Sequence, residues 1–208
     1  MQTSGSVTAL LLFASLFSID AALADVPVDV PAAVARCSSC HDPTGPSTDP
    51  MIPTLAGIGS FYLENQFAVF EARARPCIVE VLADPVDKCA LIGSLDKAQR
   101  REVAAYYAAF EYRPVEQVYD SMLAEAGAAL HAERCARCHT EDGRQPLDDS
   151  GLLAGQPIAY LRRQLESFID GSRWQPKSMA PETEDLDADD IEALAHFYAQ
   201  AGSGFDND

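Results

Sequence analysis

Basic residues are scarce in this chain of 208 residues: 15 lysines and arginines stand against 32 aspartates and glutamates, and the net charge is −17. Binding to nucleic acid requires clustered cations that replace the counterions of the phosphates. A chain this acidic is therefore not expected to have a nucleic-acid partner. Such acidity most often serves solubility, and it can also steer an encounter with a protein that carries a basic surface.

Long apolar runs are also lacking. The run from Val7 to Phe17 is too short to span a bilayer, and it is followed by Ala22-Leu23-Ala24, the small-x-small pattern that signal peptidase cleaves. No basic residue precedes the run, so an uncleaved anchor is the alternative. We predict a cleaved signal peptide at residues 1–24 and an exported, periplasmic mature chain with no membrane span. Loss of Asp20 with the signal peptide leaves a net charge of −16.

Histidine and methionine occur only four times each, so few imidazole or thioether groups are available to ligate an iron. Two of the histidines follow a Cys-x-x-Cys pair, in Cys-Ser-Ser-Cys-His at 37–41 and Cys-Ala-Arg-Cys-His at 135–139. Two thiols at this spacing can each add to a vinyl group of one haem, and the adjoining histidine can ligate its iron. A single copy could also be a zinc site or a redox dithiol, but two copies favour two covalently bound haem c groups. The predicted attachment residues are Cys37, Cys40, Cys135 and Cys138, and the predicted iron ligands are His41 and His139.

The two motifs belong to a duplicated unit. Equivalent residues lie 98 positions apart through the first part of the unit and 91 apart near its end, so the first half holds seven extra residues between Phe70 and Leu95. A constant offset over such a span indicates duplication. The pairs at 98 include Leu-Ala-Gly at 55–57 and 153–155, Gln66 and Gln164, and Phe70 and Phe168; those at 91 include Leu95 and Leu186, and Tyr107 and Tyr198.

The sequence pattern of each unit predicts three helices, so we expect an all-α fold. The first helix leads into the haem motif, over 30–40 and 120–138, and the second follows Leu-Ala-Gly. The third begins at Asp96 or Asp187, each followed three positions later by a polar residue that can complete a capping box. The polar stretch 111–116 marks the boundary between the units. We therefore expect two tandem domains, 25–113 and 114–208, with a frayed tail after residue 201.

The two units differ in the residue that is available as the second ligand of the iron. Met179, in the loop before the last helix, is the candidate in the second unit, because methionine is a known axial partner of histidine in c-type haems. An offset of 91 leads from Met179 to Lys88, beside Cys89. The first haem could therefore use a Cys89 thiolate, the Lys88 amine, Met51 or no ligand. In an oxidising compartment Cys89 could instead form a disulfide with Cys77.

Together these motifs resemble the tandem dihaem cytochromes of the class I c type. The second unit resembles the cytochrome subunit of flavocytochrome c sulfide dehydrogenase, in residues 119–124, 135–139, 153–156 and 196–199. The resemblance implies two class I cytochrome c domains that take electrons from a flavoprotein subunit and pass them to soluble electron-carrier proteins. It also implies an axial methionine in each unit, and the first unit departs from that pattern.

Two functions are consistent with these features. The first is an electron-transfer subunit, in which the chain positions two haems and needs no acid or base catalysis. The alternative is a haem enzyme that acts directly on a sulfur compound such as thiosulfate at the first haem, with Cys89 as its ligand. The two remaining histidines, His131 and His196, have no partner at ligand spacing, and we interpret them as surface or interface residues.

Overall fold

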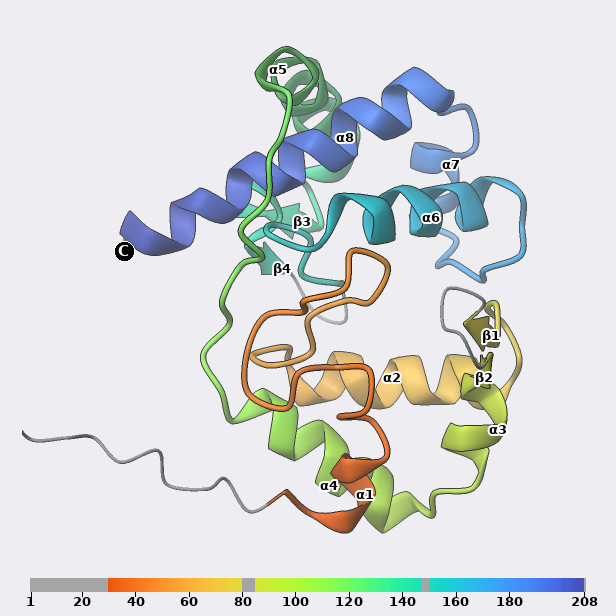
Figure 1. Ribbon diagram of the computed structural model, residues 1–208. Coiled ribbons are helices and arrows are strands. Elements are labelled where there is room, and N and C mark those ends of the chain that lie inside the picture. The colour runs from red at the N-terminus through yellow and green to blue at the C-terminus, as the bar shows by residue number, and fades with distance from the viewer. Residues whose placement is uncertain (1–29, 80–84, 147–149, 208) are drawn as a thin grey trace, which may run out of the picture.

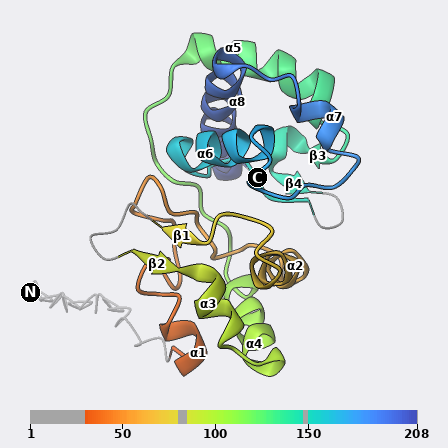
Figure 2. The ribbon, with the colours of Figure 1, turned by 90° about the vertical axis from the view of Figure 1, so that its right-hand side faces the viewer.

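The computed structural model describes residues 30–79, 85–146 and 150–207. Helices dominate these residues and are accompanied by two antiparallel pairs of two-residue strands. Figure 1 shows two groups of helices, one from each half of the chain, joined by the extended segment 111–120, and Figure 2 separates the same groups from the side. The predicted all-α fold is confirmed for the described residues. The predicted signal peptide at 1–24 lies outside them.

The first half is built from short and medium helices with a strand pair between them. The strand pair and the disulfide between Cys77 and Cys89 lie in the stretch that holds the seven extra residues. The disulfide joins the residue before the first strand to the residue two positions after the second, so it closes the base of the pair. The elements are α1 Ala32–Ala35, α2 Ser60–Glu71, β1 Ile78–Val79, β2 Val86–Asp87, α3 Lys88–Gly93 and α4 Lys97–Ala108.

The second half has longer first and last helices, and its strand pair comes before the middle helix, not after it. Its first helix continues into a π-helix at the haem motif, and its last helix continues into a 3-10 helix. The elements are α5 Ser121–Leu130, η1 His131–Cys135, β3 His139–Thr140, η2 Glu141–Gly143, β4 Gln145–Pro146, α6 Ile158–Ile169, α7 Ala180–Thr183, α8 Ala188–Ala201 and η3 Gly202–Asn207. The tail expected to fray thus forms η3, and Phe205 in it packs on Tyr112, with ring centroids 5.1 Å apart.

Both last helices begin with the capping boxes that the sequence predicted. Asp96 accepts hydrogen bonds from the Ala98 and Gln99 amides, and the Gln99 side chain accepts one from the Asp96 amide. Asp187 and Asp190 make the same exchange at α8. Such reciprocal bonds satisfy amides that have no partner within the helix, so both helices start at a defined residue.

The first helices differ from the prediction. Instead of a helix over 30–40, α1 ends at Ala35 and turns follow, because the Cys37 and Ser38 amides both donate to the Val34 carbonyl, at 2.8 and 3.0 Å. In the second half the helix widens at η1, where the Ala136 amide donates to the His131 carbonyl five residues back. The haem motifs therefore do not lie on regular α-helix, and hydrophobic periodicity cannot reveal such local changes in hydrogen bonding.

The core of the second half depends on a close crossing of α5 and α8. A Cβ added at Gly127 would lie 2.1 Å from the Ala193 carbonyl oxygen, so only glycine fits at this point of the crossing. Leu194 and Tyr198 of α8 are buried beside it. In the first half the corresponding core contains Val34, Val103 and Tyr107, all fully buried.

The Leu-Ala-Gly tripeptides attach each loop to the last helix of its own half. Gly57 has φ +81° and donates to the Tyr107 carbonyl at 2.8 Å. Gly155 has φ +74° and donates to the Tyr198 carbonyl at 2.8 Å. A positive φ is easily adopted only by glycine, which explains why both copies of the tripeptide end in it.

Polar contacts join the two halves. The Gln156 side chain accepts from the Thr54 amide at 3.0 Å and donates to the Thr54 carbonyl at 3.1 Å, as a neighbouring strand would. The Tyr160 amide donates to the Pro50 carbonyl at 3.1 Å, and the Tyr112 hydroxyl donates to the Ala154 carbonyl at 2.9 Å. Several of these groups are buried, so the halves are held in a defined orientation.

Candidate haem sites

The four cysteines of the two motifs are free thiols in the described structure, and all are partly buried. Both pairs lie on the same turn, in which the amide of the second cysteine donates to the carbonyl of the first at 3.1 Å. Each pair therefore offers two thiols from one turn, at a single place, as two thioether bonds to one haem require. The attachment residues predicted from the sequence are Cys37, Cys40, Cys135 and Cys138.

The histidines of the motifs have the same environment in both halves. The Nδ1 of His41 donates to the Pro53 carbonyl at 2.9 Å, and the Nδ1 of His139 donates to the Gly151 carbonyl at 2.9 Å. Because a carbonyl can only accept, the proton lies on Nδ1 and leaves the Nε2 lone pair free for a metal. Burial lowers the pKa of both imidazoles and is the largest cause of the shift in each. The pKa of His41 is lowered to about 4. Both rings are therefore neutral at pH 7 and suited to ligate iron.

Met179 lies in the segment between α6 and α8. It is the residue that begins α7, and its amide donates to the Pro176 carbonyl at 2.9 Å. The side chain is half-buried. Ligation by Met179 remains a prediction from the sequence.

Cys89 is bonded to Cys77 in a disulfide and is buried. A sulfur in a disulfide is not a thiolate and cannot ligate iron as one. Of the alternatives left open by the sequence, the disulfide is confirmed. The proposed sulfur-compound enzyme with a Cys89-ligated haem loses the ligand on which it depended.

Two buried arginines meet between the halves, and they were not recognised in the sequence. The guanidinium of Arg75 donates to the side-chain oxygens of Gln66 and Gln164, at 2.6 and 2.8 Å. Arg173 donates to the same two oxygens, at 3.2 and 2.8 Å. The arginines are only 7% and 8% exposed, and they are separated by the repeat offset of 98. Each also lies 4.3 Å from an equivalent ring, Phe70 or Phe168.

This cluster provides a test of whether haem fits the chain. Among the described residues, no carboxylate forms an ion pair with Arg75 or Arg173. Burial, followed by the charge of Arg173, lowers the pKa of Arg75, and burial and nearby arginines lower the pKa of Lys88 to about 8. Buried cations without anions are costly. A haem carries two carboxylate groups of its own, so an anionic cofactor at this interface fits the residues present.

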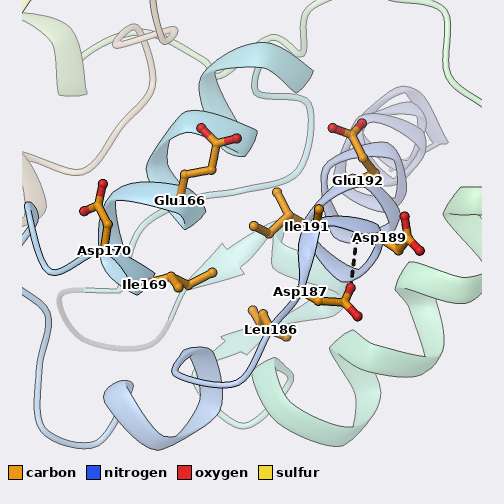
Figure 3. Close-up of a pocket in the computed structure, with 9 residues that line it drawn as sticks. Glu166, Ile169, Asp170, Leu186, Asp187, Asp189, Ile191 and Glu192 are labelled. Carbon is orange, nitrogen blue, oxygen red and sulfur yellow. Dashed lines mark hydrogen bonds between the residues drawn. The ribbon is translucent and has the colours of Figure 1, made fainter.

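An acidic hollow in the second half is separate from these sites. It has a volume of about 580 Å³ and lies between α6 and α8, as Figure 3 shows. None of the residues that line it belongs to a haem motif. Two of its carboxylates already have roles, since Asp187 caps α8 and Glu192 pairs with Arg162. We assign no ligand to it.

The two other histidines have structural roles. His131 is buried, with its Nδ1 3.1 Å from the Tyr198 hydroxyl and its ring 5.0 Å from that of Phe197. It is thus a core residue between η1 and α8, and a surface position was wrong for it. His196 accepts a hydrogen bond from the Asp120 amide at 2.9 Å and so joins α8 to the start of α5.

Comparisons with known proteins agree with this arrangement. Residues 123–197 match the family described as cytochrome C oxidase, cbb3-type, subunit III. Cytochrome c-552 of Acidithiobacillus ferridurans is 30% identical over 176 residues, which are 80% of this chain and 74% of the relative. Cytochrome c4 of Azotobacter vinelandii is 29% identical over 67% of this chain and 70% of its own. A thiosulfate dehydrogenase electron acceptor of Thiomonas intermedia is 28% identical over 69% and 67%.

Solved structures give the same result. The crystal structure of cytochrome c4 from Pseudomonas stutzeri matches with a TM-score of 0.67 and 28% identity, over 82% of this chain and 97% of that one. A thiosulfate dehydrogenase from Marichromatium purpuratum matches with a TM-score of 0.63 and 30% identity, over 79% of this chain and 37% of that one. Both matches extend over the two halves and the junction between them, since each covers more than three quarters of the chain.

Proposed function

The chain belongs to the dihaem class I cytochromes c, and from that membership we propose that it carries electrons from a thiosulfate dehydrogenase to soluble carrier proteins. It is an electron-transfer cytochrome with two covalent c-type haems. The observation that carries the proposal is the repeated site, in which a thiol pair and a histidine with a fixed Nδ1 proton recur 98 residues apart. The proposed domains are 25–113 and 114–208, after an export signal at 1–24.

The ligand assignments are part of the proposal. Cys37 and Cys40 attach one haem and Cys135 and Cys138 the other, while His41 and His139 each present Nε2 to an iron. Met179 supplies the opposite ligand in the second half. A bound haem supplies an iron that gains and loses one electron.

The chain's own residues orient these sites and set their electrostatics. The Pro53 and Gly151 carbonyls hold the two imidazoles in one tautomer and one orientation, which is the usual way a protein tunes a ligating histidine. Arg75 and Arg173 lie where the halves meet and present positive charge to both. With haems bound, positive charge near either iron would favour its reduced form and so would raise its reduction potential.

Thiosulfate dehydrogenase is the donor that the comparisons favour. Two relatives are named as its electron acceptor, and in one matched structure the similar region makes up 37% of a thiosulfate dehydrogenase chain. The flavoprotein donor expected from the sequence has no such support. The disulfide at Cys89 also argues against direct oxidation of thiosulfate at the first haem.

Charge supports a protein donor with a basic docking surface. The whole chain carries −17, and its buried cations lie between the halves. Opposite charges accelerate encounter, and salt weakens the effect over a Debye length of about 10 Å at 0.1 M. Association with the donor should therefore slow as ionic strength rises.

Stopped-flow spectroscopy tests the proposal. The mature, haem-loaded protein is first analysed as its alkaline pyridine derivative, which should give two haems per chain. The oxidised protein is then mixed with a thiosulfate dehydrogenase and thiosulfate, and haem reduction should follow, more slowly at higher salt.

The controls separate the rival functions. Thiosulfate alone should leave the haems oxidised, whereas reduction without the enzyme would make the chain an oxidising enzyme in its own right. Efficient reduction by a flavoprotein sulfide dehydrogenase with sulfide, and none by thiosulfate dehydrogenase, would overturn the proposed donor.

A further inference from the structure

Lys88 and Met179 occupy equivalent places in the two halves. Lys88 is the first residue of α3, and Met179 is the residue from which α7 begins. Both lie seven positions before a buried leucine, Leu95 or Leu186, which precedes the capping box of the last helix. Each position thus lies at the start of a short helix that precedes the last helix of its half, and the two are related by the offset of 91.

The rival ligands of the first haem are removed by their contacts. Cys89 is in a disulfide. Met51 lies two positions before Pro53, whose carbonyl accepts from His41, and the preceding Pro50 carbonyl is held by the Tyr160 amide. The backbone of this loop is therefore held on the His41 side of the site, which favours a ligand from elsewhere for the opposite face.

The strand pair and the disulfide hold Lys88 in place. The Lys88 amide donates to the Cys77 carbonyl at 2.8 Å, and Cys77 is bonded to Cys89, the residue that follows Lys88. The adjoining residues Ile78 and Asp87 are paired between the two strands. The described ends of the stretch that holds the seven extra residues, 77–79 and 85–89, are thus joined by paired strands and a disulfide beside Lys88. The function of this arrangement would be to fix the Lys88 side chain, which a longer open loop would not do.

The Lys88 side chain points into the first half. Its Nζ lies 5.0 Å from the centre of the Phe70 ring on α2, and the Arg75 guanidinium lies 4.3 Å from the same ring. Among the described residues no carboxylate pairs with Lys88, so no anion holds it as an ammonium ion.

We propose that the Nζ of Lys88 is the distal ligand of the first iron, opposite His41. The ammonium group releases one proton to water, and its nitrogen lone pair forms the bond to iron, with no change in oxidation state. The proposal rests on the proposed function only in requiring a haem at Cys37 and Cys40. The two halves then hold different centres, His–Lys in the first and His–Met in the second.

This difference in ligands sets which haem has the lower reduction potential. Methionine opposite histidine raises the potential of a c-type haem, and an amine favours the ferric state more than a thioether does. The first haem is then the weaker oxidant, and electrons that enter there pass to the second haem downhill.

Spectra of the intact, haem-loaded protein test the ligand. In the ferric protein, the near-infrared band of a sulfur–iron bond should have the intensity of one such bond per two haems. Lys88→Met places a thioether at the equivalent position, so the band should double and the lower of the two potentials should rise. Lys88→Ala should convert one haem to a high-spin form. Lys97→Met, at an exposed lysine of α4, is the matched control and should change neither.

Each result decides the question. A wild-type band equal to two sulfur–iron bonds, or an unchanged spectrum in Lys88→Ala, would overturn the proposal. The pyridine derivative of each variant should still give two haems per chain, which shows that folding and attachment survive. If Lys88→Ala gives fewer than two haems per chain, the proposal is decided by Lys88→Met, from the intensity of its near-infrared sulfur–iron band. Reduction by thiosulfate dehydrogenase is measured separately, so failure of the ligand assignment leaves the proposed donor intact.

Discussion

Arg75 and Arg173 lie on opposite sides of the junction and donate to the same two amide oxygens, those of Gln66 and Gln164. Two buried cations that share neutral acceptors repel each other, and this repulsion contributes to the lowered pKa of Arg75. Such an arrangement is unfavourable unless an anion joins it. The pair therefore fits a site that is completed by an anionic group.

Replacement of Arg75 by glutamine should lower the potential of at least one haem, because a cation near an iron stabilises its reduced form. A change of about 1 kcal/mol, or roughly 40 mV for one electron, is the expected scale. A spectroscopic redox titration measures it. Arg101→Gln, at a side chain 60% exposed on α4, should shift the potentials far less. Equal shifts in both variants would show that the junction has no special electrostatic role.

Removal of the disulfide should destabilise the first half. The bond between Cys77 and Cys89 closes a loop with a sequence separation of 12, for which loop entropy predicts about 3 kcal/mol. The double variant Cys77→Ala/Cys89→Ala should therefore unfold at lower urea concentration, while a variant of the second half such as Lys177→Ala should not. An unchanged midpoint would mean that the bond contributes nothing to stability.

The repeat offset predicted much of this structure, because local rules govern the features concerned. Capping at Asp96 and Asp187 depends on residues within one turn, and the glycines at 57 and 155 are required by their positive φ. The histidine sites recur for the same reason, since each carbonyl partner lies 12 residues along the chain.

Other features depend on contacts that no local pattern encodes. The choice between a thiolate and a disulfide at Cys89 was decided by the strand pair that brings Cys77 beside it. The pairing of Arg75 with Gln164 depends on how the halves dock, although the offset of 98 between the two arginines was a visible signal. Burial of His131 depends on the approach of α8, which its own segment does not reveal.

The crossing of α5 and α8 should not tolerate a methyl group at Gly127. Its Cβ would lie 2.1 Å from the Ala193 carbonyl oxygen and 2.7 Å from the Cβ of Phe197, so the helices would have to separate. Overpacking of this kind costs about 1–3 kcal/mol. Gly127→Ala should lower the urea midpoint accordingly. Gly93→Ala, whose added Cβ would meet no other part of the chain within 4 Å, is the control and should not unfold at a lower urea concentration than the wild type.

His131 should make the stability of the second half sensitive to acid. Burial, opposed by the charge of Asp142, lowers its pKa below the ordinary 6.5. The unfolded chain therefore binds a proton at a higher pH than the folded chain does. The stability contributed by the neutral ring is fully present above about pH 6.5 and is lost as the pH falls toward the lower folded value. Urea midpoints measured between pH 8 and about pH 5 should decline on the acid side.

His131→Gln identifies the group responsible for this decline. Glutamine does not titrate, but it can still donate to or accept from the Tyr198 hydroxyl, which lies 3.1 Å from Nδ1 in the native chain. The variant should be less stable at pH 8, because ring contacts with Phe197 are lost, yet its midpoint should fall less steeply between pH 6.5 and about pH 5. An identical slope in both proteins would assign the acid sensitivity to other groups, and His131 would then contribute through packing alone.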